Sequence, residues 1–239
     1  MSFHTFSFYS EDLVPGDTRV WLIDDEHYHI ARVLRMGTAD RVRVTNGRGL
    51  VVTAEIDHVG AKRTSAQIVG VDANHPEPVP LVLSLAMLPR ERMDLALTQC
   101  TEAGITGWMP IVAERCHVRK TIDRGERWNR IAVAALKQSG RAWLPRIEAP
   151  IDARDLPAKF KAFESVVLAD MGAAQWMDIT AKPVATLAIV GPEAGFTDVE
   201  QSHFAGAGAR PMHVSSQRLR AETAAIAVVS LLALNRGPV

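Results

Sequence analysis

A proline-rich segment, Asn-His-Pro-Glu-Pro-Val-Pro at residues 74–80, divides the sequence into two parts with different residue patterns. Proline lacks a backbone N–H and cannot donate a ladder hydrogen bond, so a central strand cannot run through this segment. We therefore expect one domain at residues 1–74, a linker at residues 75–80 and a second domain at residues 81–239. The chain has 239 residues, enough for each domain to have a hydrophobic core.

The first part of the chain has the pattern of a small β domain. Runs rich in β-branched residues occur at residues 19–23, 41–45, 50–56 and 65–69. Asn46-Gly47 lies between the second and third runs, and this dipeptide favours a tight hairpin. With a helical turn near residues 27–34, the pattern predicts a barrel-like β domain.

The second part alternates between predicted strands and predicted helices. Residues 81–88 form an almost continuous apolar run, typical of a strand buried on both faces. Thr197 and Glu200 have the spacing of a capping box, which predicts a helix from about Asp198. Further strands are expected at residues 108–112, 165–169, 186–190 and 211–215, and further helices at residues 92–103, 126–139 and 222–234. This alternation predicts an α/β fold with a parallel sheet and helices on both faces.

Charge is balanced over the whole chain but not along it. The formal net charge is +0, so the total does not indicate nucleic acid. Residues 90–146, however, contain eleven Lys and Arg against six Asp and Glu. Such an excess has two interpretations, a solvated helix face or a polyanion partner.

The two cysteines, Cys100 and Cys116, match neither a metal-binding spacing nor a disulfide framework. Reduced thiols are typical of cytoplasmic proteins, so we expect that location. The first residues lack the pattern of a signal peptide, and no apolar run reaches membrane-spanning length. We expect no metal and no membrane partner.

Two motifs near the end of the chain indicate a small-molecule pocket. Residues 191–196, Gly-Pro-Glu-Ala-Gly-Phe, follow an apolar run, and their glycines allow close approach of a ligand to the backbone. Residues 218–224, Arg-Leu-Arg-Ala-Glu-Thr-Ala, place charges at the start of an apolar helix, where burial is costly without partners. The alternative interpretation is structural: a tight turn, with an ion pair between Glu193 and Arg220. Dinucleotide, phosphate-loop and serine-nucleophile motifs are absent.

These motifs, in this order, give the chain its resemblance to a known family. It resembles the bacterial 16S rRNA uridine-N3 methyltransferases of the SPOUT class (the RsmE family). The matching blocks are residues 29–35, 90–94 with 101–105, 138–141 followed by Pro145, 191–196 and 219–224. The resemblance implies an N-terminal PUA-like β-barrel and a SPOUT-type, trefoil-knotted α/β domain with a parallel sheet. It also implies a homodimer that binds S-adenosyl-L-methionine and acts on 16S rRNA or the small ribosomal subunit.

The resemblance also implies which residues form the sites. The cofactor-binding residues expected from it are Leu168, Ala169, Asp170, Gly191, Pro192, Glu193, Ala194, Gly195, Ser215, Leu219, Arg220 and Thr223. For RNA contacts we expect Arg32, Arg35, Arg90, Arg92 and Arg141, although solvated side chains, or packing of Arg141 beside Trp143, would explain the same arginines. Ala194 replaces a glycine usual in the family, and a left-handed backbone there would cost ~1 kcal/mol or more.

The catalytic residues expected are Arg220, Glu193 and Glu222. Uridine N3 carries a proton at neutral pH, so the enzyme must remove that proton and stabilise the anion that forms. Arg220 is the candidate cation, and Glu193 or Glu222 would orient it. Two alternatives share the fold: a SPOUT methyltransferase with another RNA target, and a non-catalytic rRNA-binding assembly factor.

Overall fold

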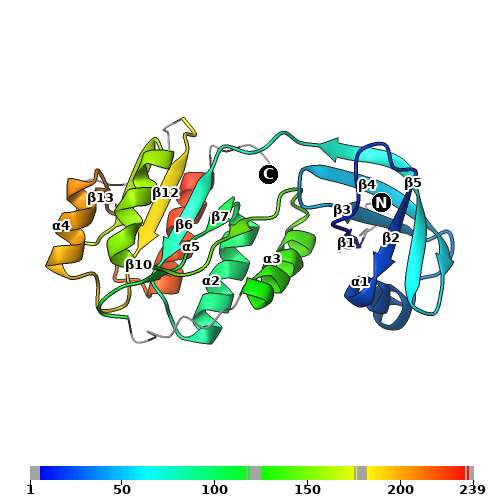
Figure 1. Ribbon diagram of the computed structural model, residues 1–239, viewed down its shortest axis with the longest axis horizontal. Coiled ribbons are helices and arrows are strands. Elements are labelled where there is room, and N and C mark those ends of the chain that lie inside the picture. Colours follow the sequence, from blue (N-terminus) through cyan, green and yellow to red (C-terminus); the bar gives the residue numbers. More distant parts are fainter. Residues whose placement is uncertain are drawn as a thin grey trace. The chain divides into compact units, whose positions relative to one another are not determined.

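A computed structural model describes residues 6–116, 118, 125–174, 176, 182–234 and 236. It divides the chain into two compact units (Figure 1). The first unit contains the described residues up to Pro78 together with Leu136–Leu144, and the second contains those of Val79–Ala135 and Pro145–Pro238.

The first unit is built on a five-stranded sheet in the order β1-β3-β4-β5-β2. Its strands are β1 (Ser7–Tyr9), β2 (Arg19–Ile23), β3 (Arg41–Thr45), β4 (Leu50–Val59) and β5 (Arg63–Asn74). Strands β3 and β4 are antiparallel and pair Thr45 with Val51, which confirms the hairpin expected at Asn46-Gly47. Between β2 and β3 lie α1 (Asp24–Tyr28) and a π-helix, η1 (His29–Leu34). Alternate residues of β2 are buried, so one face of this strand contributes to the core.

Nothing in the sequence pattern indicated that residues 136–144 belong to this first unit. The contacts are specific: Leu144 N–H donates to the Gly47 carbonyl at 2.9 Å, and Gly49 N–H donates to the Ala142 carbonyl at 2.9 Å. The Lys137 ammonium also forms an ion pair with Glu26 at 2.5 Å. These contacts join positions 93 to 111 residues apart in sequence, so local patterns do not predict them.

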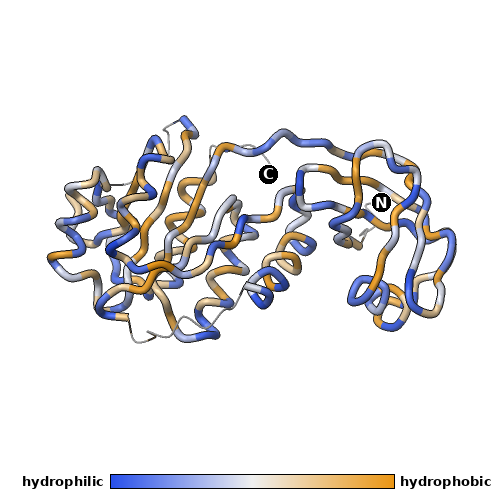
Figure 2. The backbone as a smooth tube through the Cα atoms, viewed as in Figure 1, coloured by the Kyte–Doolittle hydropathy of each residue, from blue (hydrophilic) through white to orange (hydrophobic). Residues whose placement is uncertain are grey.

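The second unit contains the predicted parallel sheet, six strands in the order β13-β11-β12-β6-β7-β9. All its pairings are parallel. The strands are β6 (Leu81–Leu85), β7 (Gly107–Trp108), β9 (Arg146–Ile147), β11 (Ser165–Ala169), β12 (Thr186–Val190) and β13 (Arg210–Met212). Every residue of β12 is buried, as expected of a central strand, and β12 is mainly orange in the hydropathy colouring (Figure 2).

Helices of the second unit cover the sheet and complete its core. These are α2 (Arg90–Ala103), α4 (Asp198–Gly206), α5 (Ala221–Ala233), a 3-10 helix, η2 (Ala153–Ala162), and the part of α3 (Gly125–Ser139) that precedes Leu136. Helix α5 packs on β6, β12 and α2, whereas α4 packs on η2. The capping box predicted at Thr197 and Glu200 is present, and Gly104 ends α2 in a left-handed conformation (φ 116°).

Several predicted strands differ from those observed. Strands β4 and β5 are longer than residues 50–56 and 65–69, and β6 ends at Leu85, before residue 88. Two other strands differ more. The strand expected at residues 108–112 is divided into β7 and β8 (Ile111–Val112), because Pro110 cannot continue a ladder. Strand β8 instead pairs with β10 (Ile151–Asp152) in a separate two-stranded sheet. The strand expected at residues 211–215 is β13, which begins one residue earlier and ends at Met212. The trefoil threading stays a prediction.

Candidate active site

A cavity of about 380 Å³ lies at the carboxyl ends of β11 and β12 in the second unit. Three chain segments form it: residues 168–171 after β11, residues 190–196 after β12, and residues 214–221 before α5. This is where ligands bind in open parallel sheets, because the loops at that edge diverge and leave a crevice. The volume lies within the range of roughly 300–1,000 Å³ that is usual for small-molecule sites.

The conformation of the segment after β12 requires both of its glycines. Gly195 has φ +72°, a left-handed conformation that disfavours other residues. A Cβ at Gly191 would lie 3.0 Å from two ring carbons of Phe196, so only glycine fits there without displacing the ring. Ala194 is not among the described non-glycine residues with positive φ, so alanine causes no strain at this position.

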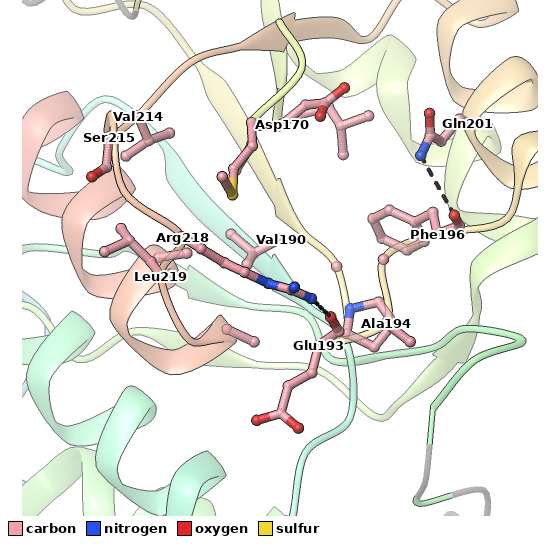
Figure 3. A pocket seen from close by; sticks show the side chains of 18 of the residues that line it. Asp170, Val190, Glu193, Ala194, Phe196, Gln201, Val214, Ser215, Arg218 and Leu219 are labelled. Carbon is pink, nitrogen blue, oxygen red and sulfur yellow. Dashed lines mark hydrogen bonds between the residues drawn. The ribbon is translucent and has the colours of Figure 1, made fainter.

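Contacts from neighbouring elements hold this segment in place. The Arg115 guanidinium donates to the carbonyls of Ala194 at 3.1 Å and Phe196 at 3.2 Å. The Phe196 ring packs edge-on against Phe204 of α4, with ring centroids 5.0 Å apart. Arg218 crosses the cavity mouth and donates to the Glu193 carbonyl at 3.3 Å (Figure 3). The wall of the cavity is therefore fixed by both side chains and backbone.

Ten of the twelve predicted cofactor-binding residues line the cavity. They are Leu168, Ala169, Asp170, Gly191, Pro192, Glu193, Ala194, Gly195, Ser215 and Leu219. The other two, Arg220 and Thr223, are exposed at the start of α5 and do not line it. Nine further residues line the cavity: Met171, Val190, Phe196, Gln201, Val214, Gln217, Arg218, Ala221 and Ala224. Most of these are direct neighbours of the predicted residues, which is the signal that would have found them.

The predicted catalytic charges have a different partner from the one expected. Glu193 or Glu222 was expected to orient Arg220, but both carboxylates pair with Arg92 of α2. Arg92 Nη1 donates to Glu193 Oε1, and Arg92 Nε lies 3.8 Å from Glu222 Oε1. In the described part of the chain, the Arg220 guanidinium forms no ion pair and is exposed. The predicted contact of Arg220 with Glu193 or Glu222 is therefore wrong, because Arg92 of α2 pairs with both carboxylates.

The arginines predicted to contact RNA fall into different environments. Arg32, Arg35 and Arg90 are exposed, whereas Arg92 is partly buried in its ion pairs. Arg141 is only 7% exposed, and burial lowers the pKa of its guanidinium to about 10. Because so little of it reaches the surface, Arg141 is the least suited of the five to contact a phosphate. Arg119, Lys120 and Arg124 of the basic stretch lie outside the described residues.

Within the described ranges of residues, the structure contains neither a side-chain cluster suited to a metal ion nor a helix suited to span a membrane. No group of three or more His, Cys, Asp or Glu side chains there is arranged to hold a metal ion. No helix there has the length and apolar character needed to span a bilayer. Both cysteines are buried, and desolvation raises the pKa of the Cys100 thiol.

Known proteins match the chain along both units. A family model described as an RNA methyltransferase domain matches residues 75–233, and one described as an RNA methyltransferase PUA domain matches residues 22–69. A ribosomal RNA small subunit methyltransferase E from Synechocystis is 29% identical over 216 residues, covering 87% of this chain and 70% of that protein.

Solved structures agree with these matches. The ribosomal RNA small subunit methyltransferase E of Neisseria gonorrhoeae, bound to S-adenosyl methionine, has a TM-score of 0.85 and 28% identity, covering 95% of this chain and 96% of its own. A methyltransferase of Legionella pneumophila, in complex with the same cofactor, has a TM-score of 0.85 and 27% identity, with coverages of 96% and 97%. The family expected from the sequence motifs is confirmed: this chain belongs to the RNA methyltransferase family.

Proposed function

We propose that this protein uses S-adenosyl-L-methionine to methylate N3 of a uridine in the 16S rRNA of the small ribosomal subunit. One observation carries the proposal: ten residues expected to bind the cofactor, drawn from three separate segments, meet in one cavity at the ends of parallel strands. A relative named ribosomal RNA small subunit methyltransferase E aligns with most of the chain, and two proteins of similar structure have S-adenosyl methionine bound.

The residues present fit this cofactor. Leu168, Val190, Phe196 and Leu219 give the cavity the apolar walls that suit an adenine ring. Backbone groups of residues 191–195 can be approached closely because Gly191 has no side chain. The Asp170 carboxylate supplies negative charge for the cationic end of the ligand. When bound, S-adenosyl-L-methionine supplies a methyl group on an already activated sulfonium.

The chain must then position the base and stabilise its anion. The N3 proton leaves before or during transfer, and negative charge spreads onto the uracil oxygens. Arg220 is exposed beside the cavity-lining residues Leu219 and Ala221, where its guanidinium can oppose that charge. It occupies the N-cap of α5, whose helix dipole has the same positive sign. Glu193 and Glu222 act one step away, through Arg92.

Several parts of the proposal concern assembly and RNA contacts. We infer that the protein forms a homodimer and is located in the cytoplasm. We also infer that its cofactor loops form a trefoil knot. Arg32 and Arg35, exposed on η1 and at its end, and Arg90 at the start of α2 are the proposed phosphate contacts. Phosphate contacts predict an RNA affinity that falls steeply with salt concentration.

Labelled methyl transfer tests the function directly. Purified protein and labelled cofactor would be incubated with small ribosomal subunits from a strain that lacks the gene, and the labelled nucleoside would be mapped. We expect N3-methyluridine at one position of 16S rRNA. Label on another RNA would favour the alternative target, and cofactor binding without transfer to any RNA would contradict the enzyme assignment. Arg220→Ala should bind the cofactor but transfer slowly in a single turnover.

A further inference from the structure

Two carboxylates, one from a cavity segment and one from the residue that follows another, converge on one guanidinium. Glu193 belongs to the segment after β12, and Glu222 lies in the first turn of α5. Arg92 Nη1 donates to Glu193 Oε1, and its Nε lies 3.8 Å from Glu222 Oε1. Arg92 itself belongs to α2, which does not line the cavity. A side chain outside the cavity thus connects two of its walls.

The burial of this cluster makes the connection important. The Glu222 side chain is 7% exposed, and its Oε2 is buried without a hydrogen-bond partner. The Arg92 and Glu193 side chains are 32% and 42% exposed, so they are only partly screened by water. A carboxylate as buried as that of Glu222 requires a nearby positive charge, and among the described residues its only ion pair is with Arg92.

The other cavity contacts of Glu193 concern its backbone. Its carbonyl accepts from Arg218 on the cavity side, while its carboxylate points away from Phe196 and from the Arg218 side chain (Figure 3). Arg218 and Arg92 therefore hold the same residue by two different groups. The position of the wall between Pro192 and Gly195 depends on both.

We propose that Arg92 is a positioning residue for the cofactor cavity, which it shapes through Glu193 and Glu222, and not a phosphate contact. The inference rests on the proposed function, since it concerns affinity for the cofactor. It replaces the RNA-binding role expected from the sequence. Without Arg92, the Glu193 wall is free to move and Glu222 is left as a buried charge without a partner.

Arg92→Gln separates the two roles when cofactor and RNA affinity are both measured. Titration calorimetry with S-adenosyl-L-methionine, in the absence of RNA, should show affinity about five- to tenfold weaker than that of the unchanged protein. Glu193→Gln should weaken it too, and the double variant should be no worse than Arg92→Gln alone, because one interaction is lost. Arg92→Lys should recover part of the affinity. Arg127→Gln, which removes a different ion pair to α2, is the matched control and should bind normally.

RNA binding gives the second measurement. The slope of log affinity against log salt should be unchanged in Arg92→Gln, whereas loss of a phosphate contact lowers it by about one. If the variant folds poorly, Arg92→Gln combined with Glu222→Gln removes the buried charge and should restore the unfolding midpoint but not cofactor affinity. Normal cofactor affinity in Arg92→Gln, or in its combination with Glu222→Gln, would overturn the inference. An unchanged protein that does not bind the cofactor would instead overturn the proposed function.

Discussion

Replacing Gly191 with alanine adds one methyl group where the cavity wall and the Phe196 ring meet. The new Cβ would lie 3.0 Å from both Cδ2 and Cε2 of that ring. Carbon atoms in contact prefer about 3.5–4.0 Å, so the ring or the backbone must move by roughly 0.5–1 Å. Phe196 is 5% exposed and its ring packs edge-on against Phe204, which limits movement of the ring toward α4. We therefore expect the displacement to narrow the cavity.

The magnitude follows from the energy of overpacking. An extra methyl group in a well-packed site costs about 1–3 kcal/mol. If most of this cost appears on ligand binding, cofactor affinity falls by about five- to 150-fold. Any part that appears in the free protein lowers the unfolding midpoint by about 2–4 °C per kcal/mol for a chain of this size.

Calorimetric titration and thermal unfolding of Gly191→Ala would measure both parts. Gly206→Ala is the matched control, because a Cβ at that position meets nothing within 4 Å. The control should bind the cofactor normally and unfold at an unchanged or slightly higher temperature. Gly191→Ala with wild-type affinity and wild-type stability would refute the argument that Phe196 and Gly191 together shape the cavity.

Three further predictions concern a glycine in a left-handed conformation, the hydrogen bonds of Arg236 and a buried thiol. Gly195→Ala should lose about 1–2 kcal/mol of unfolding free energy in urea, because φ is +72° and no atom lies within 4 Å of the added Cβ; an unchanged midpoint would show that the turn adapts. Arg236→Gln should destabilise the protein by about 1–3 kcal/mol in the same assay, since Arg236 donates to the Val184 carbonyl at 2.6 Å and to Thr186 Oγ1 at 3.0 Å. A midpoint equal to that of the unchanged protein would show that these hydrogen bonds do not stabilise the fold. Burial raises the pKa of Cys100, so its alkylation at pH 8 should be slow in the native protein and fast in urea, and fast native labelling at this residue would contradict its burial.

The central elements were predictable because their signals are local. Residues 165–169 and 186–190 are strands with the predicted bounds, since short apolar runs between polar segments are typical of buried parallel strands. The start of α4 was predictable from the reciprocal hydrogen bonds of Thr197 and Glu200. The cofactor segment at residues 191–195 was predictable from its two glycines after such a strand, whereas residues 168–170 and 215–220 were expected only from the family resemblance.

The side-chain partners were not predictable, because they join distant parts of the chain. Glu193 pairs with Arg92, which is 101 positions away, and not with the nearby Arg220. The sequence places both arginines in charged motifs but contains no information about which one lies closer in space. The hydrogen bond between Leu144 and Gly47 inside the first unit depends in the same way on tertiary packing. Such pairings follow from the packing of helices on the sheet and not from local propensity.

A crystal structure of the protein grown with S-adenosyl-L-methionine would show whether the cavity binds the cofactor. We expect electron density for the cofactor between Leu168, Gly191 and Leu219, with Arg92 still paired to Glu193. Density for the cofactor at another place, or a cavity that remains empty when calorimetry shows binding, would contradict this expectation.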